Sequence, residues 1–172
     1  MLSLSELEGA EEAFQPTNNK LCEVIRGIDL YIKEKPYMES SKLRFLLTEE
    51  KDGFPFDAIK MAIAISNLID NAFKYAISFT MIEVSTILSV DKKTITCSVR
   101  DDGNGIPPKD LERIFERFYV VDKGRSKEKG GTGLGLSIVK HVAEGHGGQV
   151  FAKSKLGEGT TFSIELPRHQ NS

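Results

Sequence analysis

Apolar residues recur every three or four positions along two stretches of the chain. The first stretch starts at Lys20 and carries Leu21, Val24, Ile25, Ile28 and Ile32. This spacing predicts an amphipathic helix that ends before Pro36. The second stretch begins at Asp57, a residue type typical of a helix N-cap, and continues to Ala76. This second helix is long and largely apolar, so we expect it to be buried on more than one side.

Strands are predicted where apolar and polar residues alternate. They cover residues 43–47, 81–90, 93–100, 149–154 and 160–166. The second and third form a hairpin turned at Asp91-Lys92, and the last two form a hairpin turned at 156–159. A third helix follows the glycines at 130–135, because Leu134, Ile138, Val139 and Val142 recur at helical spacing.

The chain length of 172 residues allows one well-buried core. We expect one globular domain over residues 16–167. Residues 1–15 carry scattered leucines and are interpreted as the remnant of a preceding amphipathic helix or as a loose terminus. Residues 168–172 are expected to form a disordered polar tail.

The net charge of −2 gives no electrostatic footprint for nucleic acid or an acidic membrane surface. Neither the two cysteines nor the three histidines have metal-ligand spacing. His141 and His146 are expected to be ordinary side chains along or just after the third helix. No apolar run approaches the roughly 18 residues that span a bilayer. We therefore expect a soluble, cytoplasmic piece without direct membrane contact.

Polar residues on the apolar second helix are the first candidates for a site. Asn67, Asn71, Lys74 and Tyr75 fall at i, i+4, i+7 and i+8, so they share one face. The alternative is a solvated stripe, but asparagine is a poor helix former and adds little solubility. As a site, Asn71 offers an amide oxygen to a hard cation, Lys74 meets a phosphate and Tyr75 lies against a base.

Two glycine clusters flank a charged, aromatic segment. The first follows a predicted strand and contains Asp101, Gly103 and Gly105. A carboxylate at the mouth of this turn can accept a hydrogen bond from an adenine amino group, and glycine lets a ligand approach closely. The second cluster, residues 130–135, opens a helix whose N-terminal amides point at an anion such as a triphosphate. Taken alone, either cluster favours a plain turn over a ligand site, because glycine serves turns so readily.

The segment between the clusters has two parts. Residues 111–119 are compatible with one or two helical turns. Residues 120–131 are rich in glycine and charge, and their lysines and arginine predict a mobile lid that closes on phosphates. A plain exposed loop is the alternative.

Together, five ordered motifs resemble the ATP-binding catalytic domain of bacterial sensor histidine kinases. The motifs are the N box at 67–75, a first glycine box at 101–105, an F box at 114–119, a second glycine box at 131–136 and a third at 157–162. The resemblance covers residues 21–167. It implies a two-layer α/β sandwich, in which a mixed, mostly antiparallel sheet of about five strands carries helices on one face.

The resemblance also implies ATP and Mg²⁺ as cofactors. It assigns catalytic roles to Asn67, Lys74 and Arg117, and metal binding to Asn71. Nucleotide binding falls to Asn71, Tyr75, Asp101, Gly103, Gly105, Ile106, Phe118, Lys123, Arg125, Gly131, Thr132, Gly133, Leu134, Gly135, Leu136 and Thr161. Of these, Thr161 is expected to support the adenine end through a water.

Relatives such as DNA gyrase and the heat-shock chaperone ATPases carry a glutamate where this chain has Asn67. An amide cannot act as a general base, so the expected activity is transfer of the γ-phosphoryl group, with hydrolysis disfavoured. The expected acceptor is a histidine on a dimerisation domain outside this chain, because no histidine here begins the family's acceptor pattern. The expected downstream partner is a response regulator, and the isolated domain is expected to be a monomer. Membrane anchoring of a full-length kinase stays open.

One departure from the family pattern affects catalysis. The residue after the Phe-Tyr of the F box is Val120, where the family usually has an arginine. A lid cation is therefore missing or replaced by Arg117, Lys123 or Arg125. Val120 therefore favours an alternative function, a catalytically weak ATP-binding regulatory module. A serine kinase of the anti-sigma-factor type is a separate alternative, because it shares the fold.

Overall fold

The computed structural model describes residues 14–33, 35, 38–39, 42–121 and 131–168. Its helices are α2 (Leu21–Lys33), α3 (Ala58–Tyr75), α4 (Pro108–Leu111) and α6 (Gly135–Gly145). Its strands are β1 (Thr17–Asn19), β2 (Leu43–Leu46), β3 (Phe54–Phe56), β4 (Ile82–Leu88), β5 (Thr94–Asp101), β6 (Gln149–Lys155) and β7 (Gly159–Pro167). The helices and strands expected from residue spacing are therefore present with bounds shifted by a few residues.

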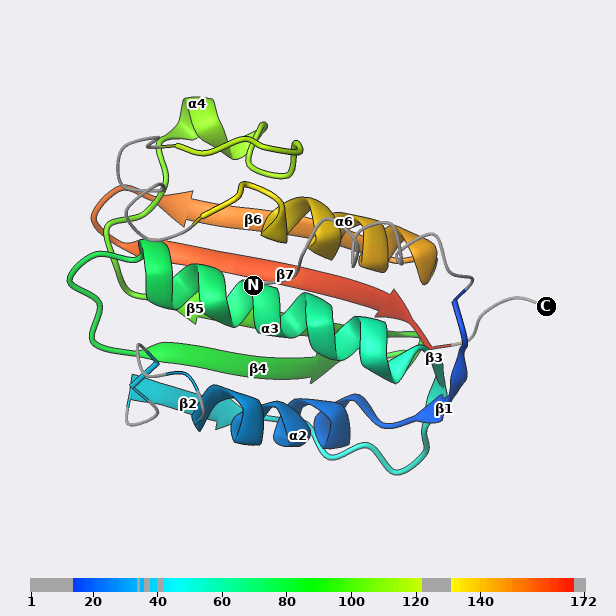
Figure 1. Cartoon of the computed structure of the whole chain (residues 1–172). Coiled ribbons are helices and arrows are strands. Elements are labelled where there is room, and N and C mark those ends of the chain that lie inside the picture. The colour runs from blue at the N-terminus through cyan, green and yellow to red at the C-terminus, as the bar shows by residue number, and fades with distance from the viewer. Residues whose placement is uncertain (1–13, 34, 36–37, 40–41, 122–130, 169–172) are drawn as a thin grey trace.

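Five strands form one sheet in the order β2-β4-β5-β7-β6. The strand β2 runs parallel to β4, whereas the other neighbours are antiparallel. The helices α2, α3 and α6 lie side by side over one face of this sheet (Figure 1). The expected two-layer sandwich with a mixed, mostly antiparallel sheet is confirmed.

The core lies between the sheet and α3. The inward positions of β4 and β5, such as Ile82, Val84 and Val99, are at most 1% exposed. They face a helix whose Met61, Ile65, Leu68 and Ile69 are all fully buried. The apolar residues that recur every second position in the strands and about every 3.6 positions in the helix thus pack together in one layer. None of the helices in the described residues is long and apolar enough to cross a bilayer.

A second, two-stranded sheet was not predicted. Antiparallel β1 and β3 pair Thr17 with Phe56 and Asn19 with Phe54. The Asn19 side-chain amide also donates to the Phe56 carbonyl oxygen at 2.9 Å. Each strand has only three residues and β3 contains a proline, so neither alternation nor β propensity could identify it.

The N-terminus of α3 is held by a buried polar network. Asp57 accepts a hydrogen bond from the Lys60 N–H at 3.0 Å, which is the predicted N-cap. The Asp57 N–H donates in turn to Nε2 of His146 at 2.9 Å. His146 is 3% exposed and follows the C-terminus of α6, so the network ties α3 to α6. The structure thus gives a structural role to His146, which we expected to be an ordinary side chain.

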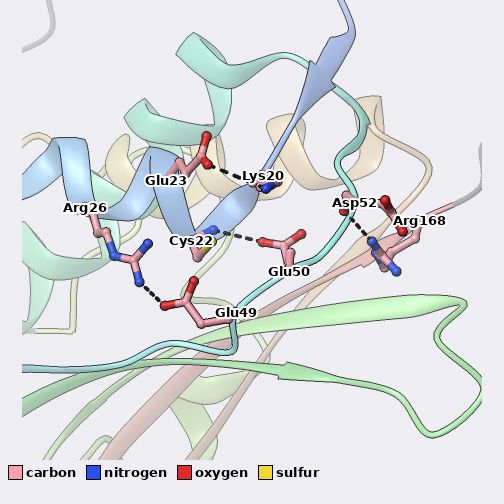
Figure 2. Close-up of polar contacts among 8 residues, drawn as sticks. All are labelled: Lys20, Cys22, Glu23, Arg26, Glu49, Glu50, Asp52 and Arg168. Atoms are coloured by element: carbon pink, nitrogen blue, oxygen red, sulfur yellow. Dashed lines mark hydrogen bonds and ion pairs between the residues drawn. The ribbon is translucent and has the colours of Figure 1, made fainter.

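The end of β7 is tied down as well. Arg168 was expected in the disordered tail, but its N–H donates to the Lys93 carbonyl and its guanidinium to the Asp52 carbonyl, both at 2.8 Å. Figure 2 shows Arg168 beside the segment that carries Glu50, whose carboxylate accepts from the Cys22 N–H at 2.9 Å. The remaining residues of that tail, and residues 1–13, lie outside the described residues.

Candidate functional site

A cavity of about 1360 Å³ opens between α3, the loop after β5 and the start of α6. Twelve of the predicted site residues line it: Asn67, Asn71, Lys74, Tyr75, Gly105, Ile106, Gly131, Thr132, Gly133, Leu134, Gly135 and Leu136. The three segments are far apart in sequence, and the fold brings them together. The cavity continues over the apolar outer surface of α2 and α3, past Val24 and Ile63.

The polar face of α3 forms one wall of this cavity. Because Asn67, Asn71, Lys74 and Tyr75 share a helix face, all four point to the same side, and each is half-buried. The Asn67 side-chain NH₂ donates to the Ile63 carbonyl at 3.0 Å, which fixes the amide and leaves its oxygen facing the start of α6. This helix face is therefore a cavity wall and not a solvated stripe.

Asp101 lies deeper, at the end of β5. It borders a small cavity of about 40 Å³ whose lining includes Asn71, Tyr75, Gly105 and Ile106, all of which also line the large cavity. Its side chain is 5% exposed and accepts from the Gly103 N–H at 3.0 Å. Burial raises the pKa of Asp101, although hydrogen bonds from the Gly103 and Thr160 backbone oppose the rise. A buried carboxylate that adjoins the cavity is a strong acceptor for a ligand N–H group.

The turn after Asp101 is held rigidly, in contrast to the freedom that its glycines suggest. Asp102 accepts from the Thr80 N–H at 2.7 Å, and the Asn104 side chain accepts from the Ile77 N–H at 2.7 Å. The Asn104 carbonyl accepts from the Gly157 N–H at 2.9 Å. The turn is thereby fixed both to the segment after α3 and to the β6–β7 hairpin.

The two glycines of this turn are required by close packing within the protein. A Cβ at Gly103 would lie 2.8 Å from Cβ of Ala76, so this glycine packs on the C-terminus of α3, and it is not among the cavity-lining residues. Gly105 has φ +71°, and a Cβ there would overlap the Lys155 carbonyl group. Only Gly105 borders the cavity as well.

The N-terminus of α6 supplies backbone donors to the opposite wall. Leu134 is the N-cap and makes no side-chain capping hydrogen bond in the described structure. Leu134, Gly135 and Leu136 all line the cavity, so the first amides of an 11-residue helix lie beside it. Unsatisfied helix N-terminal amides together with the helix dipole favour an anion.

The F box contributes a different aromatic residue from the one expected. Phe118 has φ +64°, is 67% exposed and packs through its backbone on Gly133, with its N–H donating to the Gly133 carbonyl at 2.9 Å. The following Tyr119 lines the cavity instead, and its hydroxyl donates to Asp110 at 2.6 Å. Arg117 is exposed and does not line the cavity, whereas Val120 does.

Thr161 is not brought to the cavity, but its neighbour Thr160 is. Thr160 pairs with Asp101 in the β5–β7 ladder, is 5% exposed and borders the same small cavity. Thr161 pairs with Arg100, and successive residues of a strand point to opposite faces. A motif match alone does not decide between two adjacent threonines. The predicted lid residues Lys123 and Arg125 lie outside the described residues.

The cavity wall also carries a carboxylate that was not among the predicted site residues. Asp70 lines the cavity and forms an ion pair with Lys74, with 2.8 Å between Oδ2 and Nζ. Its position three residues after Asn67 and four before Lys74 was a usable signal, because both spacings place residues on one helix face. Asn67, Asn71 and Asp70 thus bring amide and carboxylate groups to this wall, the types of oxygen donor that a hard cation prefers. Among the described residues, no group of three or more histidines, cysteines or acidic residues could hold a metal unaided.

The comparisons with known proteins agree with this geometry. The sequence profile of the histidine kinase-, DNA gyrase B- and HSP90-like ATPases matches residues 56–170. The sensor histidine kinase WalK of Bacillus subtilis is 34% identical over 169 residues, 97% of this chain and 27% of WalK. The chain thus spans about a quarter of the length of this relative.

Solved structures with the same fold include two other kinases. The catalytic domain of the histidine kinase ThkA matches with a TM-score of 0.70 and 26% identity, covering 90% of this chain and 96% of that domain. Full-length ShkA, solved in complex with AMPPNP, matches with a TM-score of 0.72 and 22% identity, covering 92% of this chain and 32% of ShkA. The expected resemblance to histidine kinase catalytic domains is confirmed, and the chain belongs to the family of histidine kinase-, DNA gyrase B- and HSP90-like ATPases.

Proposed function

We propose that this chain binds ATP with Mg²⁺ and transfers the γ-phosphoryl group to a histidine on a separate dimerisation domain, as part of two-component signalling with a response regulator. The observation that carries the proposal is the convergence of the polar face of α3, the Asp101 turn and the N-terminus of α6 on one cavity. Family membership, the relatives named sensor histidine kinases and the AMPPNP bound by ShkA support the same ligand class.

The adenine end of the ligand is assigned to the deep part of the cavity. The Asp101 carboxylate would accept from the exocyclic amine, and Thr160 lies beside it. Ile106, Tyr75 and Leu156 provide apolar surface for a flat ring. A buried acceptor selects a ligand with an N–H group, because a ligand without one leaves the carboxylate unsatisfied.

The phosphate end is assigned to the opposite part of the cavity. Lys74 and the first amides of α6 would bind the triphosphate, and Asn71 would hold Mg²⁺ together with phosphate oxygens. The bound metal would neutralise negative charge on the transferred phosphoryl group. Asn67 orients groups by hydrogen bonding but cannot remove a proton from water, which favours transfer over hydrolysis.

The test is to incubate the chain with γ-labelled ATP and a purified histidine-bearing dimerisation domain. Acid-labile label on that domain supports the proposal, provided that Asn71→Ala abolishes the transfer. No label on the domain, despite demonstrated ATP binding, contradicts it. Acid-stable label would instead identify a serine kinase of the anti-sigma-factor type.

One observation favours a second candidate, a catalytically weak ATP-binding regulatory module. The cavity wall carries the apolar Val120 where the family pattern has an arginine, and Arg117 lies exposed outside the cavity. Val120→Arg distinguishes the two candidates. A large gain in transfer at unchanged ATP affinity indicates a kinase weakened at this position. A measurable transfer rate that Val120→Arg leaves unchanged supports the active kinase.

A further inference from the structure

The cavity wall formed by α3 contains a single acidic side chain. Among the described lining residues, Asp70 carries the only carboxylate, and Lys35 and Lys74 are the only cations. Asp70 and Lys74 are paired at 2.8 Å, and both side chains are about one quarter exposed. Within the described residues of α3, the phosphate end of the proposed site therefore presents an ion pair without net charge next to Asn71.

This charge arrangement has different consequences for the two forms of the nucleotide. A triphosphate bound in this cavity without metal would bring its full negative charge close to the Asp70 carboxylate, and like charges repel. A triphosphate that carries Mg²⁺ is less negative and presents a hard cation, for which a carboxylate is a good ligand. Asp70 thus opposes the first form and attracts the second.

We infer that Asp70 makes this site select the metal-bound nucleotide, acting directly on the metal–triphosphate complex. The inference rests on the proposed function, and it gives the metal a second oxygen donor beside Asn71. Asp70 immediately precedes Asn71 on the helix, and both residues line the cavity with Asn67. The competing interpretation is an ordinary i,i+4 helix pair, which would affect helix stability and not the coupling between metal and nucleotide.

The experiment measures ATP affinity by titration calorimetry in excess Mg²⁺ and in EDTA. The readout is the dissociation constant in EDTA divided by the dissociation constant in Mg²⁺. This ratio expresses the coupling between metal and nucleotide. In Asp70→Asn we expect this ratio to fall by about tenfold, a typical coupling factor, mainly through tighter binding of metal-free ATP. The affinity for adenosine, which has no phosphate, should not change.

Two further variants separate the possible causes. Glu144→Gln removes the acid of another i,i+4 pair, Lys140–Glu144 on α6, at a position outside the cavity, and should leave the ratio unchanged. Lys74→Met tests whether Asp70 acts only through its ion pair with Lys74, which would keep the lysine from the phosphates. If Asp70→Asn still lowers the ratio in the Lys74→Met background, the carboxylate acts on the metal complex as inferred.

The results that would overturn this inference differ from those that would overturn the proposed function. An unchanged ratio in Asp70→Asn, or an effect that disappears in the Lys74→Met background, overturns the inference while ATP binding stands. ATP binding by the unmodified chain that is equally tight with and without Mg²⁺ also overturns it. No ATP binding under either condition overturns the proposed function and this inference together.

Discussion

The side-chain oxygen of Asn67 faces Gly135, so the polar face of α3 meets the first turn of α6 at this point. A Cβ at Gly135 would lie 3.1 Å from Asn67 Oδ1, closer than side-chain atoms normally pack. The Asn67 amide is fixed by its hydrogen bond to Ile63, so it cannot turn away without losing that bond. This contact places the N box directly beside the second glycine box. It leaves little room for a side chain at Gly135, the first residue of α6.

We therefore expect Gly135→Ala to reduce ATP affinity by about tenfold, since small displacements of binding groups are costly. Thermal stability should change little, because the helix propensity gained by removing a glycine offsets the steric cost. Titration calorimetry and thermal unfolding measure both. Gly27→Ala shows the propensity gain alone, because its Cβ would meet nothing within 4 Å, and it should raise stability by about 0.5–1 kcal/mol. Unchanged ATP affinity in Gly135→Ala would contradict the role of this contact.

Gly105 and Gly157 provide a matched pair for the glycine turn. Both have positive φ, but only at Gly105 does a Cβ meet protein atoms, those of the Lys155 and Leu156 backbone. Gly157→Ala should cost about 1 kcal/mol through backbone strain alone. Gly105→Ala should cost about 3 kcal/mol or more, because the turn or the hairpin must also move. Urea unfolding of both variants tests this difference, and equal losses would argue against the close approach.

The Asp101 carboxylate should lower the stability of the folded chain at neutral pH, although it contributes to ATP binding. Its pKa is raised in the folded protein by burial, so between about pH 4 and the raised value the folded state holds more protons than the unfolded state. Stability contributed by this group then falls as pH rises through that window. Asp101→Asn should remove this decline and weaken ATP binding by about 1–3 kcal/mol. The measurement is urea unfolding of both proteins at several pH values, together with ATP titration; parallel pH profiles would contradict the assignment.

His146 should give the opposite slope. Its Nε2 accepts from the Asp57 N–H, so the ring proton lies on Nδ1, which donates to the Val142 carbonyl at 2.7 Å. Burial lowers the pKa of His146, and the unfolded chain therefore binds the proton first, at about pH 6.5. Stability should be lost as pH falls below about 6.5.

The comparison of His146→Ala with the unmodified chain isolates this contribution. The variant should be less stable at neutral pH and should lack the loss between about pH 6.5 and the lowered pKa. His141→Ala, at an exposed position of α6, is the control and should keep the slope. If His146→Ala still loses stability as the pH falls below about 6.5, another group is responsible for the pH dependence.

Much of the fold could be predicted because its elements are long and strictly periodic. The α3 helix is a clear case, since the N-cap at Asp57 defines its start and the 3.6 period defines its polar face. The β1–β3 pair could not be predicted, because three-residue strands have too few positions to show a period. The Asp57–His146 hydrogen bond joins residues 89 positions apart, and such contacts depend on packing that no local pattern encodes.

The site was predictable where a residue's position on an element determines its direction. Asn67 and Asn71 are such cases, because helical spacing fixes their common face. The choices of Phe118 over Tyr119 and of Thr161 over Thr160 did not match the cavity lining, because one residue along an extended or turning backbone reverses the direction of a side chain. Gly103 was given a ligand role, although its packing partner is Ala76.

The central claim is that α3, the Asp101 turn and the start of α6 form one nucleotide pocket. The most direct test is a titration of the ¹⁵N-labelled chain with ATP and Mg²⁺, followed through the backbone amides of Asn71, Gly105 and Gly135. We predict that all three amides shift along one saturating curve with a common dissociation constant, and that Asp101→Asn weakens all three equally. Saturation at only one of these segments, different constants for the three, or no saturable shift would contradict the claim.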